Sequence, residues 1–257
     1  MSQTTATTSA SHAPLAGKIA LVTGGSRGLG AAIVRRLAAD GAHVAFTYVS
    51  SADKANALAE QVQTLGVRAL AIQADSARPE AVENAIHQAA KELGGLDILV
   101  NNAGVAAGGP IDQTSLEDFD RQFAVNVRGV FVAIKTAAGY LKEGGRIINI
   151  GSVLGDSTPL PGLSVYSATK SAVAGLTRGA ARDLGPRGIT VNNIQPGPID
   201  TDMNPADGPG ADAQRALLSI KRHGKAEEIA AAVSYLASPG AAFTTGISLN
   251  VDGGFNG

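Results

Sequence analysis

Short apolar runs alternate with amphipathic, alanine-rich stretches along almost the whole chain, and this alternation restricts the fold more than any other feature. Runs such as Ile19-Ala20-Leu21-Val22 and Ile98-Leu99-Val100 are apolar throughout, as expected for parallel strands that helices cover on both faces. Strands that alternate with helices form βαβ units and a mostly parallel sheet. We therefore predict one α/β domain, a Rossmann-type doubly wound parallel sheet of about seven strands with helices on both faces.

The individual elements follow from hydrophobic periodicity and from the positions of Gly and Pro. Strands are predicted over residues 18–23, 43–49, 67–73, 96–101, 146–151, 189–194 and 247–251. Helices are predicted over residues 28–40, 53–65, 79–93, 115–141, 166–184, 211–220 and 226–237. No linker or internal repeat interrupts this pattern, so residues 14–257 are predicted to form a single domain. Ligands of such a sheet bind at the carboxyl ends of the strands.

Composition narrows the classes of function. The 257 residues carry a formal net charge of −1, which gives no indication of a nucleic-acid or anionic-membrane partner. The absence of cysteine excludes disulfides, thiol catalysis and cysteine-ligated metals. The histidines stand too far apart in the sequence for metal-ligand spacing, so no metal site is predicted; they are His12, His43, His87 and His223.

Residues 1–13 are rich in Ser, Thr and Ala and lack the apolar segment of a signal peptide. We expect them to form a disordered tail. No apolar run approaches the roughly 20 residues that a membrane-spanning helix needs. A cytoplasmic protein without a membrane partner is the resulting expectation.

A glycine-rich turn, Thr23-Gly24-Gly25-Ser26-Arg27-Gly28-Leu29-Gly30, joins the first predicted strand to the first predicted helix. Glycines allow the backbone to turn tightly and to approach a pyrophosphate, and the helix N-terminus supplies free N–H donors. Because the strand–turn–helix context is the one that the motif requires, we interpret the turn as a dinucleotide site. The alternative is a tight turn without a ligand.

The end of the second predicted strand indicates which dinucleotide binds. An NAD-binding unit often places an acid there, where it binds the ribose 2′-hydroxyl. This chain has Tyr48-Val49-Ser50-Ser51 instead, with no acid before Asp53. Arg27 is a cation able to face a 2′-phosphate, to which Ser50 and Ser51 could donate hydrogen bonds with help from Lys54. We therefore predict NADPH rather than NADH, the alternative being that Arg27 is an ordinary surface cation.

Tyr166 and Lys170 stand four residues apart in the predicted helix 166–184, so their side chains project from the same face. A phenol has an ordinary pKa of about 10, and a nearby cation lowers that pKa. The pair is therefore a candidate proton donor and acceptor. Taken alone, the same spacing also fits a packed ring beside a solvated amine.

Between about residue 15 and residue 254 the chain strongly resembles the single-domain short-chain dehydrogenases/reductases. The resemblance implies an NAD(P)-dependent enzyme similar to the 3-oxoacyl carrier-protein reductases and related ketone reductases. The motifs that carry it occur in the family's order: the glycine turn 23–30, Asp75, Asn101-Asn102-Ala103-Gly104, Asn126 in Val125-Asn126-Val127, Ser152 after Ile150-Gly151, Tyr166-Ser167-Ala168-Thr169-Lys170, Pro196-Gly197-Pro198-Ile199-Asp200-Thr201 and Val251-Asp252-Gly253-Gly254.

The resemblance implies four catalytic residues. Tyr166 would be the general acid that protonates the substrate oxygen, and Lys170 would lower the Tyr166 pKa and bind the nicotinamide ribose. Ser152 would hydrogen-bond the carbonyl and stabilise charge on its oxygen. Asn126 would help hold a water that links Lys170 to a proton relay. Read without the family, Ser152 is an ordinary strand-end serine and Asn126 a residue at a local break in the helix.

The resemblance also implies the residues that contact the cofactor. Asp75 would contact the adenine, Asn102 the adenosine ribose, and Ile199 and Thr201 the nicotinamide carboxamide; Asp75 also fits a simple turn after the third strand. The predicted cofactor-binding set is Gly24, Ser26, Arg27, Gly28, Leu29, Gly30, Tyr48, Ser50, Ser51, Asp75, Ser76, Asn102, Ala103, Gly104, Tyr166, Lys170, Pro196, Gly197, Ile199 and Thr201.

In the family a substrate lid follows the position of Thr201, and here the Pro- and Gly-rich segment near 202–222 corresponds to it. A mainly apolar small-molecule carbonyl or alcohol substrate is predicted. The predicted substrate residues are Ser152, Val153, Leu154, Leu160, Leu163, Tyr166 and Met203.

Assembly is predicted from the same resemblance. Helices equivalent to 115–141 and 166–184 pack across a dimer interface in the family, and the segment equivalent to 246–257 often makes a second one. A homotetramer with two-fold axes is expected. The apolar faces in question include Phe123, Val127, Phe131, Val173 and Leu176, and the alternative is that they pack only on their own sheet.

Three functions remain in competition. The leading one is an NADPH-dependent oxidoreductase that reduces a ketone or 3-oxoacyl-type carbonyl to a secondary alcohol. An NAD-dependent secondary-alcohol dehydrogenase differs at the segment after Val49. A non-catalytic dinucleotide-binding regulator predicts the loss of Ser152, Tyr166 or Lys170, and all three residues are present.

Overall fold

The computed structural model describes residues 13–257, and its centre is a seven-stranded sheet in the order β3-β2-β1-β4-β5-β6-β7. Every neighbouring pair of strands is parallel. The predicted doubly wound Rossmann-type sheet is thereby confirmed. The strands are β1 Ile19–Val22, β2 His43–Tyr48, β3 Ala69–Gln73, β4 Ile98–Asn101, β5 Arg146–Ile150, β6 Thr190–Pro196 and β7 Ser248–Val251.

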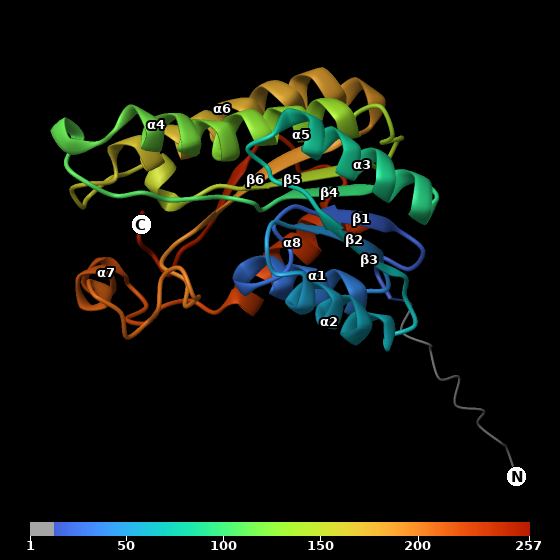
Figure 1. Ribbon diagram of the computed structural model, residues 1–257, viewed down its shortest axis with the longest axis horizontal. Helices are drawn as coiled ribbons and strands as arrows, with labels where there is room; N and C mark the ends of the chain where they lie inside the picture. Colours follow the sequence, from blue (N-terminus) through green and yellow to red (C-terminus); the bar gives the residue numbers. More distant parts are fainter. Residues whose placement is uncertain (1–12) are drawn as a thin grey trace, which may run out of the picture.

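Helices cover both faces of the sheet (Figure 1). On one side lie α1 (Gly28–Ala39), α2 (Ala52–Gln63) and α8 (Ala226–Ala237). On the other side lie α3 (Pro79–Leu93), α4 (Leu116–Phe123), α5 (Gly129–Ala137) and α6 (Ser164–Leu184). The short helix α7 (Ala211–Leu217) stands apart from both layers, beyond one end of the sheet.

The hydrophobic core has one layer on each sheet face because side chains alternate along a strand. In β1, Ala20 and Val22 pack into the cluster formed with α1 and α8. Leu21 points the other way, into the cluster formed with α3, α5 and α6. All three side chains are completely buried, which explains why β1 reads as a continuous apolar run.

Most predicted elements differ from the observed ones by a few residues at their ends, and one differs in kind. The predicted helix 115–141 is interrupted by a wider, π-helical turn at Ala124–Arg128, which separates α4 from α5, and α5 ends at Ala137. β6 is longer than predicted and reaches Pro196, which pairs with Val251 of β7. These features depend on contacts between distant segments, which periodicity does not report.

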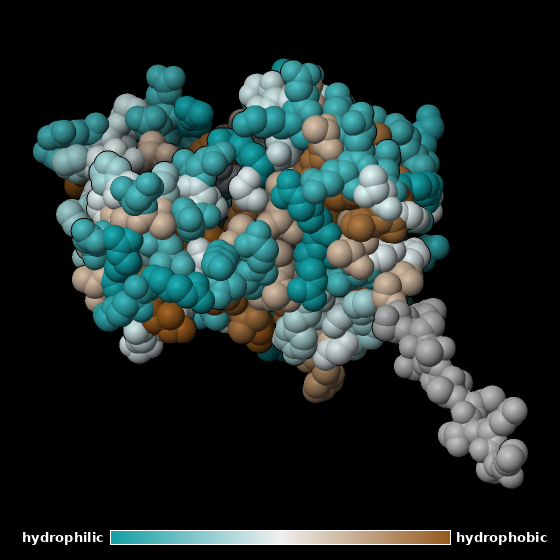
Figure 2. All heavy atoms as spheres, turned by 90° about the horizontal axis from the view of Figure 1, so that it is seen from below, coloured by the Kyte–Doolittle hydropathy of each residue, from teal (hydrophilic) through white to brown (hydrophobic). Residues whose placement is uncertain are grey.

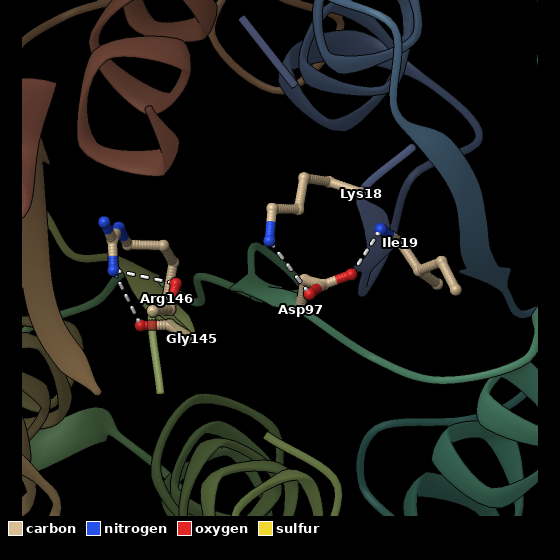
Figure 3. Close-up of polar contacts among 6 residues, drawn as sticks. Lys18, Ile19, Asp97, Gly145 and Arg146 are labelled. Atoms are coloured by element: carbon tan, nitrogen blue, oxygen red, sulfur yellow. Dashed lines mark hydrogen bonds and ion pairs between the residues drawn. The ribbon is translucent and has the colours of Figure 1, made fainter. Parts of the chain in front are cut away.

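The amino ends of the strands are held by polar contacts (Figure 3). The Asp97 carboxylate accepts a hydrogen bond from the Ile19 backbone N–H at 2.9 Å and pairs with the Lys18 ammonium at 3.3 Å. Arg146 donates to the carbonyl oxygens of Gly144 and Gly145 at 2.8 and 3.2 Å. Asp97 thus ties β4 to β1, in keeping with the structural role that its place before a strand indicates.

The outer face over α1, α2 and α8 is mostly hydrophilic, with hydrophobic side chains in separate spots (Figure 2). Within residues 13–257, no helix is both long and apolar enough to cross a bilayer. The same residues contain no group of three acidic or histidine side chains placed to hold a metal ion. The tail predicted over 1–13 lies outside the described residues, apart from Ala13.

Candidate active site

An open cleft of about 930 Å³ lies at the carboxyl ends of strands β1 to β6. Its floor includes the turn after β1 and the turn after β4, the two neighbouring strands at which the sheet order reverses. This is the place where doubly wound sheets bind ligands. All the predicted cofactor and substrate residues line the cleft, and of the predicted site residues only Asn126 does not.

The glycine turn after β1 is folded tightly against its neighbours. Gly24 N donates to the Thr47 hydroxyl, and Gly25 N donates to the Thr47 carbonyl, both at 2.9 Å. A Cβ added at Gly30 would lie 2.2 Å from the Gly24 carbonyl oxygen and 2.6 Å from the Asn102 side-chain nitrogen. Since no side chain caps the first turn of α1 at Arg27, the free N–H groups of that turn remain available to an anion in the cleft.

Asn102, directly after the neighbouring strand β4, holds this turn in place. Its side-chain nitrogen donates to the carbonyl oxygens of Thr23 and Gly24 at 2.9 and 3.0 Å. The Thr23 hydroxyl in return accepts hydrogen bonds from the backbone N–H groups of Asn102 and Ala103 at 3.0 Å. Asn102 therefore shapes the glycine turn and lines the cleft at the same time.

One end of the cleft is cationic and rich in hydroxyl groups. Arg27, Ser50, Ser51 and Lys54 all line it, and neither cation forms an ion pair among the residues that the structure describes. Asp75 at the end of β3 also faces the cleft, while its carboxylate accepts a hydrogen bond from Ala77 N at 2.9 Å. Asp75 therefore forms a turn after β3 and also faces the cleft.

Ser152, Tyr166 and Lys170 meet where β5 ends and α6 begins. The Lys170 ammonium lies 5.5 Å from the centre of the Tyr166 ring and donates to the Ile150 carbonyl at 2.9 Å. The Ser152 hydroxyl accepts a hydrogen bond from Leu154 N at 3.2 Å. Lys170 and Ser152 are buried, and Tyr166 retains an exposed edge in the cleft. The helical spacing therefore does bring the phenol and the ammonium together.

The protonation of the pair differs from what the spacing alone predicts. Burial raises the pKa of Tyr166 to about 12, and a side-chain hydrogen bond with Ser152 lowers that pKa only in part. Burial lowers the pKa of Lys170 to about 8. The predicted fall in the Tyr166 pKa is thus wrong for the protein without ligands, because desolvation disfavours the phenolate. The phenol stays protonated throughout the neutral range, which is the state that a general acid requires.

Asn126 lies in the π-helical turn, behind the cleft wall. Its side-chain nitrogen donates to the Val105 carbonyl at 2.8 Å and to the Thr169 hydroxyl at 3.1 Å. Its side-chain oxygen accepts from Val105 N at 2.9 Å. Both amide hydrogens therefore have protein acceptors, so the side chain fixes the loop after β4 against α6. The predicted help of Asn126 in holding a water stays a prediction, since its side-chain oxygen accepts only one hydrogen bond here.

The far end of the cleft is lined by apolar side chains and by the segment after β6. The predicted lid segment is held by a pair of amides: Asn204 and Gln214 donate to each other at 3.0 and 2.9 Å. The imidazole Nε2 of the buried His223 lies 2.8 Å from the Gln214 side-chain oxygen. The three side chains join both arms of the segment near the cleft.

Sequence reasoning missed several residues that line the cleft. Thr47 is a polar residue inside a buried strand, a signal that could have drawn attention to it. Phe255 directly follows the last family motif, Val251-Asp252-Gly253-Gly254, and lies just outside it. The remaining ones depend on the path of loops and carry no local signal. The missed polar or aromatic cleft residues are Thr47, Arg121, Asp202, Asn204, Gln214 and Phe255.

Several known proteins are similar to this chain in sequence. The model of the family described as Enoyl-(Acyl carrier protein) reductase matches residues 24–256. The cyclic-di-GMP-binding biofilm dispersal mediator protein of Escherichia coli K12 is 49% identical over 239 residues, which cover 93% of this chain and 97% of the relative. The 3-oxoacyl-(acyl-carrier-protein) reductase FabG of Staphylococcus epidermidis is 39% identical over 240 residues, which cover 92% of this chain and 98% of the relative.

A solved structure is similar over nearly the whole chain. It is the crystal structure of a short-chain dehydrogenase from Burkholderia cenocepacia J2315 in complex with NADP. The two chains are 55% identical with a TM-score of 0.94, and the match covers 95% of this chain and all (100%) of that chain.

Proposed function

Because the chain belongs to the short-chain dehydrogenase/reductase family of NAD(P)-dependent oxidoreductases, we propose that it uses NADPH to reduce a ketone or 3-oxoacyl-type carbonyl to a secondary alcohol. The observation that carries the proposal is the meeting of Ser152, Tyr166 and Lys170 at the apolar end of the cleft. A partly buried, protonated phenol beside a strand-end hydroxyl suits proton donation to a carbonyl oxygen.

Each side chain has a defined task in the reduction. NADPH, when bound, supplies the hydride to the carbonyl carbon. Ser152 donates a hydrogen bond to the carbonyl oxygen and stabilises the charge that develops on it. Tyr166 transfers its phenolic proton to that oxygen. Lys170, held by the Ile150 carbonyl, stabilises the resulting phenolate by its positive charge.

The side chains and backbone groups that line the cleft suit the phosphate groups of NADPH. The free N–H groups of α1 and the close backbone approach at Gly30 suit a pyrophosphate. Arg27, Ser50, Ser51 and Lys54 suit a 2′-phosphate, because they offer two hydroxyls and two cations that form no ion pair with a described acid. The relative from Burkholderia, crystallised with NADP, supports the same choice.

The substrate is a small, mainly apolar carbonyl compound. Val153, Leu154, Leu160, Leu163 and Met203 line the end of the cleft that contains Ser152. The segment 202–222 acts as the lid of this end, since Met203, Asn204 and Gln214 face the cleft from it. The substrate therefore enters between a fixed catalytic loop and a segment that hydrogen bonds between its own side chains hold in place.

We infer a homotetramer in the cytoplasm. Large apolar side chains are exposed on α4 and α5, including Leu116, Phe119 and Phe131 at 80%, 39% and 50% of full exposure. A face of this kind suits a second copy of the chain. The prediction that Val173 lies on the interface face is wrong, because this side chain is buried in the core of its own subunit.

Two other functions make different predictions. An NAD-dependent secondary-alcohol dehydrogenase works faster with NAD than with NADP. A regulator without turnover is a second candidate because the relative from Escherichia coli is named for binding cyclic-di-GMP. Such a regulator binds that nucleotide in competition with NADPH and does not need Tyr166.

The test compares NADPH with NADH across a panel of ketones, for the native protein and for Tyr166→Phe. We expect faster oxidation of NADPH, and a loss of activity of about 10²- to 10⁴-fold in Tyr166→Phe with NADPH affinity retained. Tyr235→Phe is the matched control, since that ring is half exposed and outside the cleft. Activity that survives in Tyr166→Phe contradicts the mechanism. Faster use of NADH contradicts the cofactor, and cyclic-di-GMP binding without ketone turnover favours the regulator.

A further inference from the structure

Phe255 lines the cleft although no motif points to it, and its ring is half-buried. It belongs to the last residues of the sequence, 252–257, which we name the C-terminal hook. Figure 1 shows the C-terminus close to α7, beyond the end of the sheet. The hook therefore lies at the end of the molecule where the lid segment stands.

The hook has a fixed local shape. The Asp252 carboxylate accepts hydrogen bonds from Gly254 N at 3.0 Å and from Asn256 N at 3.1 Å. Gly253 and Gly254 have φ angles of 62° and 77°, a left-handed conformation that residues with a side chain rarely adopt. The two glycines reverse the chain and the carboxylate holds the reversal, which presents Phe255 at a defined position.

The hook is anchored on both sides of the substrate end. Asn256 donates from its side chain to the Val153 carbonyl at 3.0 Å, one residue from Ser152. Ser219 N and Ile220 N, at the end of the lid segment, both donate to the Gly253 carbonyl at 2.9 Å. Phe255 stands between these anchors, so its ring belongs to the substrate end of the cleft and not to the cationic end.

We propose that Phe255 is a specificity-determining residue that forms an aromatic wall of the substrate site, and that the site takes ketones with a flat apolar substituent, such as aryl ketones. This rests on the proposed ketone reduction and names its substrate class. An aromatic ring contributes a large apolar contact area and a preferred geometry for a second ring. The same ring limits the room for a second bulky group on the carbonyl.

The test measures kcat and KM for 2-butanone, acetophenone and benzophenone with NADPH, for the native protein, Phe255→Leu and Phe255→Ala. In Phe255→Ala we expect kcat/KM for acetophenone to fall about tenfold, mainly through KM, and the ratio of benzophenone to acetophenone activity to rise about tenfold. Phe255→Leu should lie between the native protein and Phe255→Ala. The affinity for NADPH should stay within about twofold, because the hook contacts the substrate end.

Phe243→Ala is the matched control, because Phe243 is a fully exposed ring outside the cleft. Asn256→Ala tests the anchor on Val153 and should change the ketone preference in the same direction, by less than Phe255→Ala. Equal effects on all three ketones, or an effect on NADPH affinity alone, overturn the proposal.

Binding of acetophenone to the NADPH complex, followed by saturation-transfer NMR, separates this inference from the proposed reaction. Binding that Phe255→Ala weakens, without any turnover by the native protein, supports the aromatic wall and refutes the reductase function. Turnover with the same ketone preference in the native protein and in Phe255→Ala supports the reductase function and refutes the aromatic wall. Neither binding nor turnover by the native protein overturns both.

Discussion

The Tyr166–Lys170 pair shows how burial sets the chemistry of single residues. The phenol has a pKa of about 12 and the ammonium a pKa of about 8, both shifted from their ordinary values by loss of solvent. The ordinary pKa values of both groups are near 10, and burial shifts the two values in opposite directions. The phenol keeps its proton in the neutral range, and the ammonium becomes the group that titrates just above it.

We predict that kcat/KM for ketone reduction falls as pH rises through about 8, because this parameter reports the enzyme before the ketone binds and Lys170 loses its proton near this pH. Tyr166 remains protonated up to about pH 12, so it does not limit the rate in this range. In Lys170→Arg the side chain keeps its charge, and the alkaline fall should move to higher pH. A pH–rate profile of both proteins checks this, and an unmoved limb contradicts the assignment to Lys170.

The buried charge of Lys170 also costs stability. Its folded pKa is depressed, so the cost is fully present below about pH 8 and disappears as pH rises to the unfolded value of 10.5. We predict that Lys170→Met raises the free energy of unfolding at pH 7 by about 2 kcal/mol, after allowing for the lost hydrogen bond to Ile150. Urea denaturation at pH 7 and pH 10 measures it, and a gain that does not shrink at pH 10 would contradict the cause.

At the scale of elements, the π-helical turn between α4 and α5 places Asn126 opposite Val105. The extra width of the turn lets one amide satisfy both the N–H and the carbonyl of Val105 and also reach Thr169. The π-helical turn thus fixes the loop after β4, which lines the cleft, although Asn126 itself does not line it.

We predict that Asn126→Leu lowers the free energy of unfolding by about 2 kcal/mol, because it leaves the polar groups of Val105 without partners. NADPH affinity should fall as well, since the loop that carries Gly104 loses its support. Chemical denaturation and a fluorescence titration with NADPH measure the two effects. Thr169→Val removes only the third partner of the amide, keeps both hydrogen bonds to Val105 and should lose less of both, and equal losses in the two variants would rule out this explanation.

The lid segment is a second element whose position depends on few contacts. Gln214 is shared between Asn204 and His223, so its removal breaks the link between the two arms. We predict that Gln214→Ala accelerates hydrogen exchange in residues 202–222 by roughly tenfold while the strands stay unchanged. Gln214→Glu keeps an oxygen acceptor for Asn204 and His223 and should have a smaller effect. Unchanged exchange in Gln214→Ala would show that the amide pair does not hold the segment.

At the scale of the whole molecule, the exposed apolar face of α4 and α5 is the feature that a single subunit leaves unexplained. We predict that Phe131→Lys reduces the proposed tetramer to a smaller species, because a desolvated charge opposes association. Sedimentation velocity measures the change. Lys135→Ala, a change on the same helix that removes a charge instead of adding one, should leave the tetramer intact. A native monomer would refute the assembly itself.

Most of the fold and much of the site are readable from local patterns. The apolar runs predicted all seven strands, because strands covered by helices on both faces are rich in apolar residues. Spacing alone brought Tyr166 and Lys170 to one face of α6, and the glycine turn followed from backbone requirements that hold within a few residues. Such properties depend on residues that are close together along the chain, so they can be predicted before the fold is known.

Tertiary structure decided the rest. The direction of the Tyr166 pKa shift depends on how many atoms surround the phenol, and these come from segments far apart in the chain. The hydrogen bonds of Asn126 to Val105, the amide pair of the lid and the hydrogen bond of Asn256 to Val153 likewise depend on loops brought together by the sheet. Burial and long-range hydrogen bonds are properties of the packed molecule, because they arise only when distant residues share the same space.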